Sequence, residues 1–505
     1  MLSSTDVWVL GIYLALTMGH GLWVARRRET SSDYFLAGRR IPWTLLGLSL
    51  FASNMSGASF IGLMGASYDH GLAVFNYEWT AAVVLILFAA FLLPMLLKYQ
   101  VYTIPELLEV RFDARCRKFY SAFTILAIIF IDTAGALYAG GVVIASVTPF
   151  SLSVSVLVLA SVAGVYTALG GLSAVVVTDA VQSVLLILGG ALISYFTMVE
   201  LGGWDAAWAL VDERRRHLIR PSSDAFLPWP GIFGVCLLGF YYWALNQFVV
   251  QRALGAKDLS AGQRGALFAG LIKLPNLLII ILPGVWATAL FPDLGNPDLV
   301  FPKLAFELLP AGVRSLVMVA LLAAILSSLD SALNAAATLV TMDFVRPVRP
   351  RLTDDQLVAI GRVVTIVCVG ISAAYAPSIA QFENLFGYFQ SVLAYITPPV
   401  VASYFGALFM RGLKPSAVLL VLSSSIWLGV PLFIFNEVMN LSSIHYTYAS
   451  IILFLGSLVM MAVTSVVLGG ASGRNMTAPP RPTRSFVIQS GLLLMCVAGL
   501  ILWLA

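Results

Sequence analysis

The stretch 51–61 interrupts an apolar segment, 43–68, that is long enough to cross a bilayer. Its small and polar residues include Ser53, Asn54, Ser56 and Gly57. Because a helix cannot expose unpaired backbone groups to lipid, this composition suits a helix that unwinds beside a polar cavity. A broken helix of this kind is expected to build a substrate or ion site near the bilayer midplane.

Five ionisable side chains lie inside predicted membrane segments: Glu78, Asp132, Asp179, Lys273 and Asp330. Each costs roughly 2.5–3.5 kcal/mol or more near the bilayer centre, so such groups usually face an interior cavity. Glu78 stands between Tyr77 and Trp79, and a carboxylate flanked by aromatic rings suits a hydroxylated ligand. Lys273 could donate to that ligand or neutralise Glu78 as a structural pair, and both interpretations stay open.

Three serines, Ser327, Ser328 and Ser331, share one face of the predicted helix 312–342. Hydroxyl oxygens beside an unwound helix are neutral ligands that suit a hard cation. The alternative is close helix packing through small residues, which is common in membranes. Asp330, in the same helix, requires a counter-charge, which a second cation, a proton or an arginine would supply.

The remaining polar candidates give weaker signals. Asp179 is expected at the start of the sixth helix, where it would either cap the helix or ligate a cation. Asp132 has no evident partner in the sequence, and a buried structural hydrogen bond is the favoured interpretation. Tyr242, Trp243 and Gln390 lie well inside predicted segments, and each taken singly favours packing over binding.

Transmembrane helices must position these side chains. The chain has 505 residues, of which 60% are hydrophobic and 11% charged, whereas a soluble protein carries roughly 25% charged residues. The apolar runs predict an all-α polytopic membrane protein with about 14 transmembrane helices. The predicted segments are 5–25, 43–68, 72–97, 119–147, 152–172, 178–200, 229–251, 265–292, 312–342, 356–378, 384–410, 415–435, 447–469 and 486–504.

The basic residues predict the orientation. Twenty-two of the 29 lysines and arginines, Arg252 among them, fall on one set of predicted loops, and six fall on the other set. The richer set is expected to be cytoplasmic, which places both termini outside. The basic cluster 26–28 follows the first apolar run, so that run is expected to stay as a helix rather than act as a signal peptide. A compact chain of helical spans indicates a cell inner membrane.

Two halves of five predicted helices, 43–200 and 229–410, enter the membrane from opposite sides and are expected to form an inverted repeat. The second half has a weaker interruption, marked by glycines at 231, 234 and 239 before the aromatic run 241–243. Residues 1–42 supply an extra helix and a cytoplasmic loop, 201–228 an external loop, and 411–505 about three flanking helices.

Catalytic motifs are missing from the sequence. The four cysteines and four histidines are scattered without metal-ligand spacing. Phosphate loops, dinucleotide fingerprints and nucleophile elbows do not occur in a suitable context. We therefore expect no enzyme activity, no nucleic acid binding and no obligate protein partner. The expected partners are a small solute and the lipid bilayer.

Several short motifs recur in a specific order along the chain: Asp33–Arg39, Ala52–Asn54, Phe60–Gly62, Tyr77–Trp79, Thr103–Glu106, Arg111–Phe112, Gly170–Ala174, Tyr241–Trp243, Asn246–Gln247, Gln251–Arg252, Ser327–Ser328, Thr341–Asp343 and Gln390. Together they resemble the solute:sodium symporter family, and most closely its sodium/glucose and sodium/galactose cotransporter branch. The resemblance runs from about Asp33 to Leu504.

That resemblance implies a LeuT-like core with flanking helices and alternating access coupled to sodium. It implies a sodium site made by the backbone carbonyls of Ala52, Met55 and Ala324 and the hydroxyls of Ser327 and Ser328. It further implies a sugar site made by Asn54, Glu78, Trp243, Lys273 and Gln390, with Tyr242 as the inner gate and Tyr77 and Phe386 along the outer side.

Three positions of the sugar site depart from the family pattern. Relatives often carry Gln or His at the position of Ser59, and the galactose transporter has Asn at Gly239 and Ser at Ala81. A site built to pair a hydroxyl rejects analogues that lack it. We therefore expect these lost hydrogen-bonding groups to change which sugar is accepted more than they change coupling.

A second cation site is a further expectation from the resemblance. Asp330 stands where some relatives with a second sodium site have Ser, and with Asp179 and Ser331 it could form that site. More than one sodium would then accompany each substrate molecule. The alternative is a one-sodium transporter in which Asp330 is structural.

The sequence is therefore expected to encode a sodium-coupled importer of a hexose-like sugar. The same fold could instead carry sialic acid, inositol, a vitamin or an amino acid, or be coupled to protons through Asp179 or Asp330. A sensor or channel is a further alternative. A carboxylated substrate is less favoured, since it would need a cation that Lys273 does not supply while it pairs with Glu78.

Overall fold

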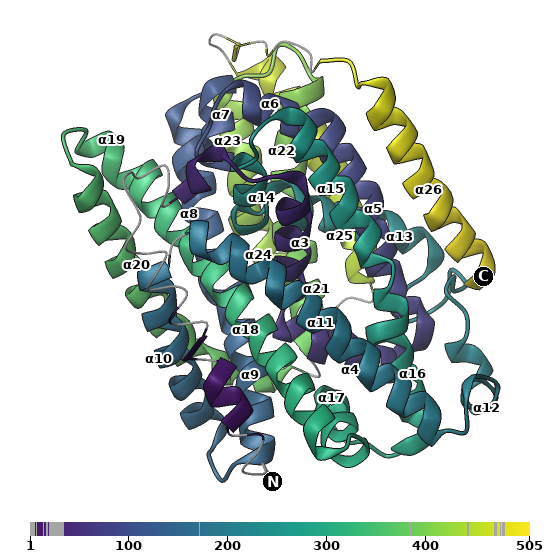
Figure 1. Ribbon diagram of the computed structural model, residues 1–505. Helices are drawn as coiled ribbons and strands as arrows, with labels where there is room; N and C mark the ends of the chain where they lie inside the picture. The colour runs from purple at the N-terminus through teal and green to yellow at the C-terminus, as the bar shows by residue number, and fades with distance from the viewer. Residues whose placement is uncertain are drawn as a thin grey trace.

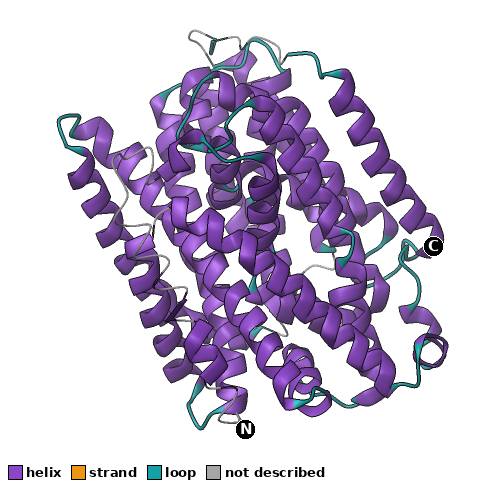
Figure 2. Cartoon of the chain, in the orientation of Figure 1, coloured by secondary structure: helices purple, strands orange, loops and turns teal. Residues whose placement is uncertain are grey.

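The computed structural model describes residues 35–504, apart from 171, 383–384, 442–443, 469–471, 475 and 477–479, together with residues 6, 8–13, 15–16 and 19. The expected helix 5–25 and the start of the family-like motif at Asp33 therefore lie largely outside the described residues. The described part is a bundle of helices (Figure 1; Figure 2). It contains no β-strand, and its two isolated bridges join Ile41 to Ala256 and Arg220 to Pro228.

Helices follow the apolar runs of the first half of the chain. They are α3 (Trp43–Asn54), α4 (Gly57–His70), α5 (Asn76–Leu87), α6 (Leu93–Lys98), α7 (Ile104–Arg111), α8 (Ala114–Ala127), α9 (Ala134–Val147), α10 (Leu152–Gly170), α11 (Leu172–Glu200) and α12 (Trp204–Ala209). A wide π-helical turn, η4 (Ile128–Thr133), joins α8 to α9.

The second half is helical in the same way. Its helices are α13 (Ile232–Phe240), α14 (Gln247–Leu254), α15 (Leu259–Lys273), α16 (Leu282–Leu290), α17 (Val300–Lys303), α18 (Ala311–Leu339), α19 (Arg346–Val348), α20 (Asp354–Tyr375), α21 (Leu385–Ile396), α22 (Pro398–Phe409), α23 (Pro415–Ser424), α24 (Val430–Phe433), α25 (Tyr446–Val467) and α26 (Arg484–Leu504). The π-helical turn η7 (Tyr241–Leu245) follows α13.

Within the described residues, nine continuous helices are long and apolar enough to span a membrane, and eleven if each of two bent pairs counts as one span. The expected number of 14 is not confirmed. One expected helix, 5–25, is largely undescribed, and the apolar part of α10 is short of a full span. The expected helix 384–410 is instead a pair, α21 and α22, bent by 50°. The bend follows from Pro398 and Pro399, which cannot donate a backbone hydrogen bond.

The helix α18 lies at the centre of the bundle and α26 at its edge (Figure 1). In α18, 89% of the most apolar stretch is buried inside the protein, against 22% in α26. The helix α18 packs against α11, α3 and α20, and α3 packs against α15 and α11. The serines of α18 are therefore held close to the end of α3, where the chain unwinds.

Candidate functional site

The predicted break in segment 43–68 is confirmed. The helix α3 ends at Asn54, Met55 leaves the helical region with φ −80° and ψ 68°, and Ser56 is extended. Ser56 then caps α4, because its hydroxyl accepts a hydrogen bond from the Ser59 N–H at 2.9 Å. Gly57 permits the close approach to α18 at this point, since a Cβ there would overlap Ile325.

The break releases a carbonyl at the end of α3. In an uninterrupted helix the Ser56 N–H would donate to the Ala52 carbonyl, but here it donates to the carbonyl of Asn54 at 2.9 Å. The Asn54 carbonyl also accepts a hydrogen bond from the Ser59 hydroxyl at 2.8 Å. The Ala52 carbonyl is thus freed from the helical ladder at a position where the family resemblance implies a sodium ligand.

A cavity of about 130 Å³ lies beside this break. Eight of the nine predicted substrate residues line it, and they are Asn54, Ser59, Tyr77, Glu78, Tyr242, Trp243, Phe386 and Gln390. Other lining residues include Ser53, Ser56, Asp132, Leu238, Gly239, Phe389 and Ser328. Residues from the first and second halves of the chain therefore meet in one polar and aromatic space.

The ninth predicted residue, Lys273, pairs with Glu78 behind the cavity wall. The Lys273 ammonium donates to the Glu78 carboxylate at 2.7 Å, and the Asn276 amide donates to the same oxygen. The ammonium also lies 3.4 Å from the Met55 sulfur and 5.5 Å from the centre of the Trp243 ring. The charge pair is thus formed and tied to the break through Met55.

Aromatic side chains close one end of the cavity. The rings of Tyr77 and Phe386 meet edge to face with their centres 5.0 Å apart, and Phe226 lies 6.3 Å from each of them. The Tyr77 hydroxyl is 2.5 Å from that of Tyr446. Phe226 and Tyr446 had no sequence signal, since each lies far along the chain from the residues it contacts.

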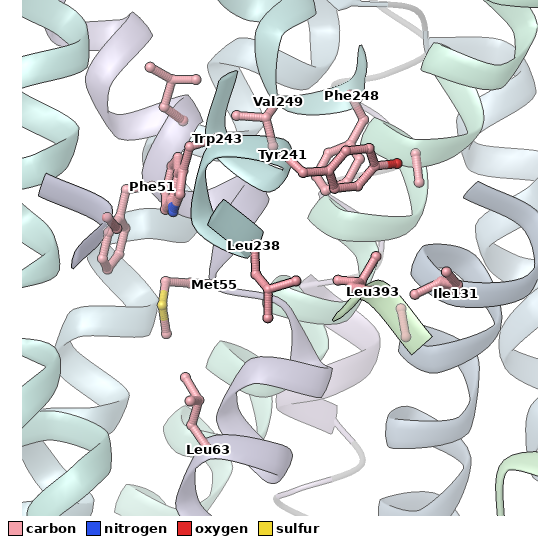
Figure 3. Close-up of a cluster of buried hydrophobic side chains, with 14 of the residues drawn as sticks. Phe51, Met55, Leu63, Ile131, Leu238, Tyr241, Trp243, Phe248, Val249 and Leu393 are labelled. Carbon is pink, nitrogen blue, oxygen red and sulfur yellow. The ribbon is translucent and has the colours of Figure 1, made fainter. Parts of the chain in front are cut away.

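The second break lies further along the chain than the glycines at 231–239 indicated. The helix α13 runs through Gly234 and Gly239, and η7 carries the aromatic run. Asn246 is then extended with ψ 123°, and α14 departs at 48°. The Asn246 side chain caps α14 by accepting from the Phe248 N–H. Figure 3 shows Leu238 between Met55 on one side and Leu393 with Ile131 on the other, below the turn that carries Tyr241 and Trp243.

The two adjacent serines of α18, Ser327 and Ser328, have different surroundings. Ser328 lines the cavity, and its hydroxyl donates to the Ala324 carbonyl at 2.9 Å. Ser327 is fully buried and donates to Asp179 at 2.5 Å. Both hydroxyl oxygens keep lone pairs that are free to accept or to ligate a cation.

The Asp179 carboxylate lies in a sealed network. It accepts from Ser49 at 2.5 Å and forms a buried ion pair with Arg252 at 3.2 Å. Arg252 also donates to Ser49 at 3.0 Å and to the hydroxyl of Ser331. Asp179 is in the interior of α11, which begins at Leu172, so the expectation of a helix-start position is wrong.

The position of Arg252 also differs from the expected one. The count of basic loops placed it in the cytoplasm, but it lies in α14 with 1% of its surface exposed. It directly follows the predicted segment 229–251, and its partner Asp179 is 73 residues away. Asp330, the third member of the predicted second cation site, is fully buried in α18.

Asp132 was not predicted to reach a binding site. It lies in η4 and lines the cavity, where the Asn246 amide donates to it at 3.4 Å. The expected structural hydrogen bond is therefore present but long. Within the described residues, no group of three or more His, Cys, Asp or Glu side chains could hold a metal ion.

Comparisons with known proteins identify the class of this protein. The model of the "Sodium:solute symporter family" matches residues 34–418, and the chain belongs to that family. It is therefore a sodium-coupled solute symporter with sodium as its coupling ion, and it is a transporter rather than an enzyme.

Similar proteins have sugar-related names. The sodium/glucose cotransporter of Vibrio parahaemolyticus is 34% identical over 92% of this chain and 91% of its own length. The sodium/glucose cotransporter 1 of Sus scrofa is 30% identical over 92% of this chain and 79% of its own length. The sodium/myo-inositol cotransporter 2 of Homo sapiens is 32% identical over 92% of this chain and 77% of its own length. A solved Na+-coupled sialic acid symporter in a substrate-bound outward-open state shares the fold, with a TM-score of 0.83, 20% identity, and coverage of 94% of this chain and all of that one.

Proposed function

We propose that this symporter couples inward sodium movement to the uptake of a hexose-like sugar by alternating access. The supporting observation is the cavity beside the break, which joins the Glu78–Lys273 pair to aromatic faces of Tyr77 and Trp243. A sugar presents hydroxyls at its edge and C–H groups on its faces, so it suits both kinds of wall. The proposed sugar site comprises Asn54, Ser59, Tyr77, Glu78, Tyr242, Trp243, Lys273, Phe386 and Gln390.

Sodium is proposed to bind where α3 unwinds against α18. Its ligands would be the carbonyls of Ala52, Met55 and Ala324 and the hydroxyls of Ser327 and Ser328. Because these ligands come from two helices, sodium would hold the break against α18 and favour the state in which the sugar site is complete. Sodium shifts that equilibrium only by its differential affinity for the two states.

The aromatic residues are proposed as gates. Tyr77 and Phe386 would close over the bound sugar from the outer side, supported by their edge-to-face contact. Tyr242, on the widened turn η7, would be the inner gate whose movement releases the sugar. A π-helical turn often marks a functional position in a helix, because it loosens the regular hydrogen-bond ladder.

Among alternative solutes, a cyclic polyol such as myo-inositol is the second candidate. It matches a hexose in size and hydroxyl content, and a 32% identical human relative has the name of a myo-inositol cotransporter. Sialic acid is less favoured because its carboxylate needs a cation, while Lys273 is already held 2.7 Å from Glu78. If none of the four solutes in the transport assay described below accumulates, a vitamin or an amino acid becomes the candidate solute, and uptake driven by a proton gradient would indicate proton coupling.

The topology is also a proposal. We infer 14 helices, inverted repeats over 43–200 and 229–410, an extra helix within 1–42, an external loop over 201–228 and flanking helices within 411–505. The two chain breaks, after Asn54 and at Asn246, lie near the start of the two repeats and support this division. The inner membrane location rests on the helical spans of a compact chain, and the outward-facing termini rest on the basic loops that remain after Arg252 is removed from the count.

A second cation site at Asp179, Asp330 and Ser331 stays a prediction. The guanidinium of Arg252 contacts two of these three residues, Asp179 and Ser331. A cation there would compete with a fixed positive charge for the same oxygens. We therefore expect one sodium per sugar, and a measured coupling ratio of two would restore the second site.

The experiment that tests the proposed function is uptake of radiolabelled galactose, glucose, myo-inositol and sialic acid into proteoliposomes, with and without an inward sodium gradient. Sodium-driven accumulation of a hexose supports the proposal. Accumulation of sialic acid alone, or accumulation driven by a proton gradient without sodium, would overturn it. A Glu78→Gln variant controls for passive leak, since its proteoliposomes should accumulate no sugar.

A further inference from the structure

Asp132 is a cavity-lining carboxylate with no assigned role in the sodium or sugar site. It lies on the π-helical turn η4, which is held from two sides. Ser372 of α20 donates to the Ile129 carbonyl at 2.8 Å, and Tyr388 of α21 donates to the Phe130 carbonyl at 2.6 Å. These bonds fix the turn that carries Asp132 at the cavity wall.

The carboxylate has unused hydrogen-bonding capacity. Its hydrogen bond from the Asn246 amide is long, at 3.4 Å. An ionised carboxylate can accept about four hydrogen bonds. The side chain is partly exposed, in contrast to Asp179, which is fully buried. Because Asp132 lines the cavity, a bound solute could reach its remaining acceptor positions.

Asp132 also differs from Glu78 and Asp179 in its charge balance. Glu78 is paired with Lys273 and Asp179 with Arg252. The ion pairs of the described residues do not include Asp132. Its ionisable neighbours there are Tyr241, Tyr242 and Tyr388, which supply no positive charge.

The cavity therefore has one neutral ion pair and one carboxylate without a basic partner. A solute that brings a positive group would supply the missing charge, and one that brings a carboxylate would meet repulsion in a low-dielectric site. We propose that Asp132 is a further substrate-contacting residue that sets the charge preference of the cavity, so that amino sugars bind more tightly than neutral sugars and uronic acids bind least. This inference rests on the proposed sugar transport and deepens it.

The test is sodium-dependent competition against radiolabelled galactose in proteoliposomes at slightly alkaline pH, where carboxylates are ionised and a primary alkyl amine is still largely protonated. The competitors are unlabelled galactose, 2-amino-2-deoxygalactose, 6-amino-6-deoxygalactose and galacturonate. In the wild-type protein we expect at least one amino sugar to compete about tenfold better than galactose, and galacturonate about tenfold worse. A charge-assisted hydrogen bond is worth roughly that factor.

The Asp132→Asn variant keeps the size and removes the charge. We expect this variant still to transport galactose. The amino sugar and galacturonate should each compete about as well as galactose does, because the charge that distinguished them is gone. Asp298→Asn is the control, since Asp298 is a carboxylate of the same bundle that accepts from the Leu385 N–H and is buried outside the cavity lining. The control should retain the wild-type preference for the amine.

The outcomes separate the two proposals. If galactose is transported but Asp132→Asn keeps the wild-type order of competitors, the role of Asp132 is refuted and sugar transport stands. An equal loss of preference in Asp298→Asn would also refute it, because the effect would then be indirect. If no sugar competes in the wild-type protein, the proposed function fails first and the inference fails with it.

Discussion

Two buried ion pairs, Glu78–Lys273 and Asp179–Arg252, flank the end of α3, and they differ in what surrounds them. Glu78 lines a cavity, and the Asn276 amide, which contacts the Met55 thioether, donates to its carboxylate. Asp179 is fully buried, and its remaining partners are the hydroxyls of Ser49 and Ser327. The same chemistry therefore serves two purposes, since one carboxylate can meet a solute and the other is fully satisfied by the protein.

The contrast bears on why a protein keeps buried charges at all. A buried ion pair is weak evidence for stability, because desolvation offsets most of its attraction. Removing one partner is nevertheless strongly destabilising when nothing else can solvate the charge that remains. We expect a substitution in the sealed pair, Asp179–Arg252, to lower the stability of the protein most. We expect a substitution in the cavity pair, Glu78–Lys273, to lower its transport activity most.

The largest expected effect is on stability, from Arg252→Met. It leaves Asp179 as an uncompensated charge in a fully buried site, which costs about 3–5 kcal/mol. The melting temperature of the detergent-solubilised protein should fall steeply. The double variant Arg252→Met with Asp179→Asn should recover most of the loss, because the stranded charge is gone. A similar loss in the double variant would mean that Arg252 acts through packing alone.

The next effect is on transport, from Lys273→Met. Glu78 loses its cation, but the adjacent cavity admits water, so the melting temperature should fall less than in Arg252→Met. Sodium-driven sugar uptake should fall about a hundredfold, because a polar site with a broken pair no longer matches the hydroxyls of its substrate. Equal destabilisation by the two substitutions would contradict the distinction between the sealed pair and the cavity pair.

Substitutions of two serines of α18 should distinguish the cavity from the Asp179–Arg252 network by a smaller effect, measured as the sodium dependence of uptake. Ser328 lines the cavity, whereas Ser331 accepts from Arg252. Ser328→Ala should raise the sodium concentration for half-maximal uptake about tenfold, as expected for the loss of one oxygen ligand. Ser331→Ala should leave that concentration nearly unchanged. The reverse order would place the coupling cation at the sealed network instead.

The smallest effect concerns Asp298, a third buried carboxylate, in the segment between α16 and α17. Burial raises its pKa to about 6, the Leu385 N–H opposes that rise, and the charge of Asp69 adds to it. Since the folded-state pKa is the higher one, the folded protein binds the proton more tightly. Its stabilising contribution is complete below the unfolded pKa, near 4, and is lost as the pH rises through 6.

The melting temperature should therefore include a component of about 2 °C that declines between pH 4 and pH 6.5. Asp298→Asn should remove that component while other pH effects remain. An unchanged pH profile in this variant would show that Asp298 does not titrate in this range. Sodium-dependent uptake by the same variant should stay at the wild-type level at pH 7.

Sequence analysis was sufficient wherever the physical cause is local. Small and polar residues at 53–57 predict a break because a lipid-facing helix cannot tolerate them, and the chain unwinds at Met55 and Ser56. Opposite charges in separate apolar segments suggested a pair of Glu78 and Lys273 because neither is stable alone in a membrane, but the sequence left open whether Lys273 would donate to the solute instead. The ordered motifs add the family, which the sequence comparison confirms.

The sequence by itself determined the helical membrane class and the first break, because hydropathy and the hydrogen-bonding needs of the backbone act over short stretches of chain. The tertiary structure decided that Arg252 turns inward to Asp179, that the second break falls at Asn246, and that Asp132 reaches the cavity. Each of these depends on which helices pack together across more than 70 residues. A short hydropathy pattern contains no information about such distant neighbours, whose positions follow from packing around α18.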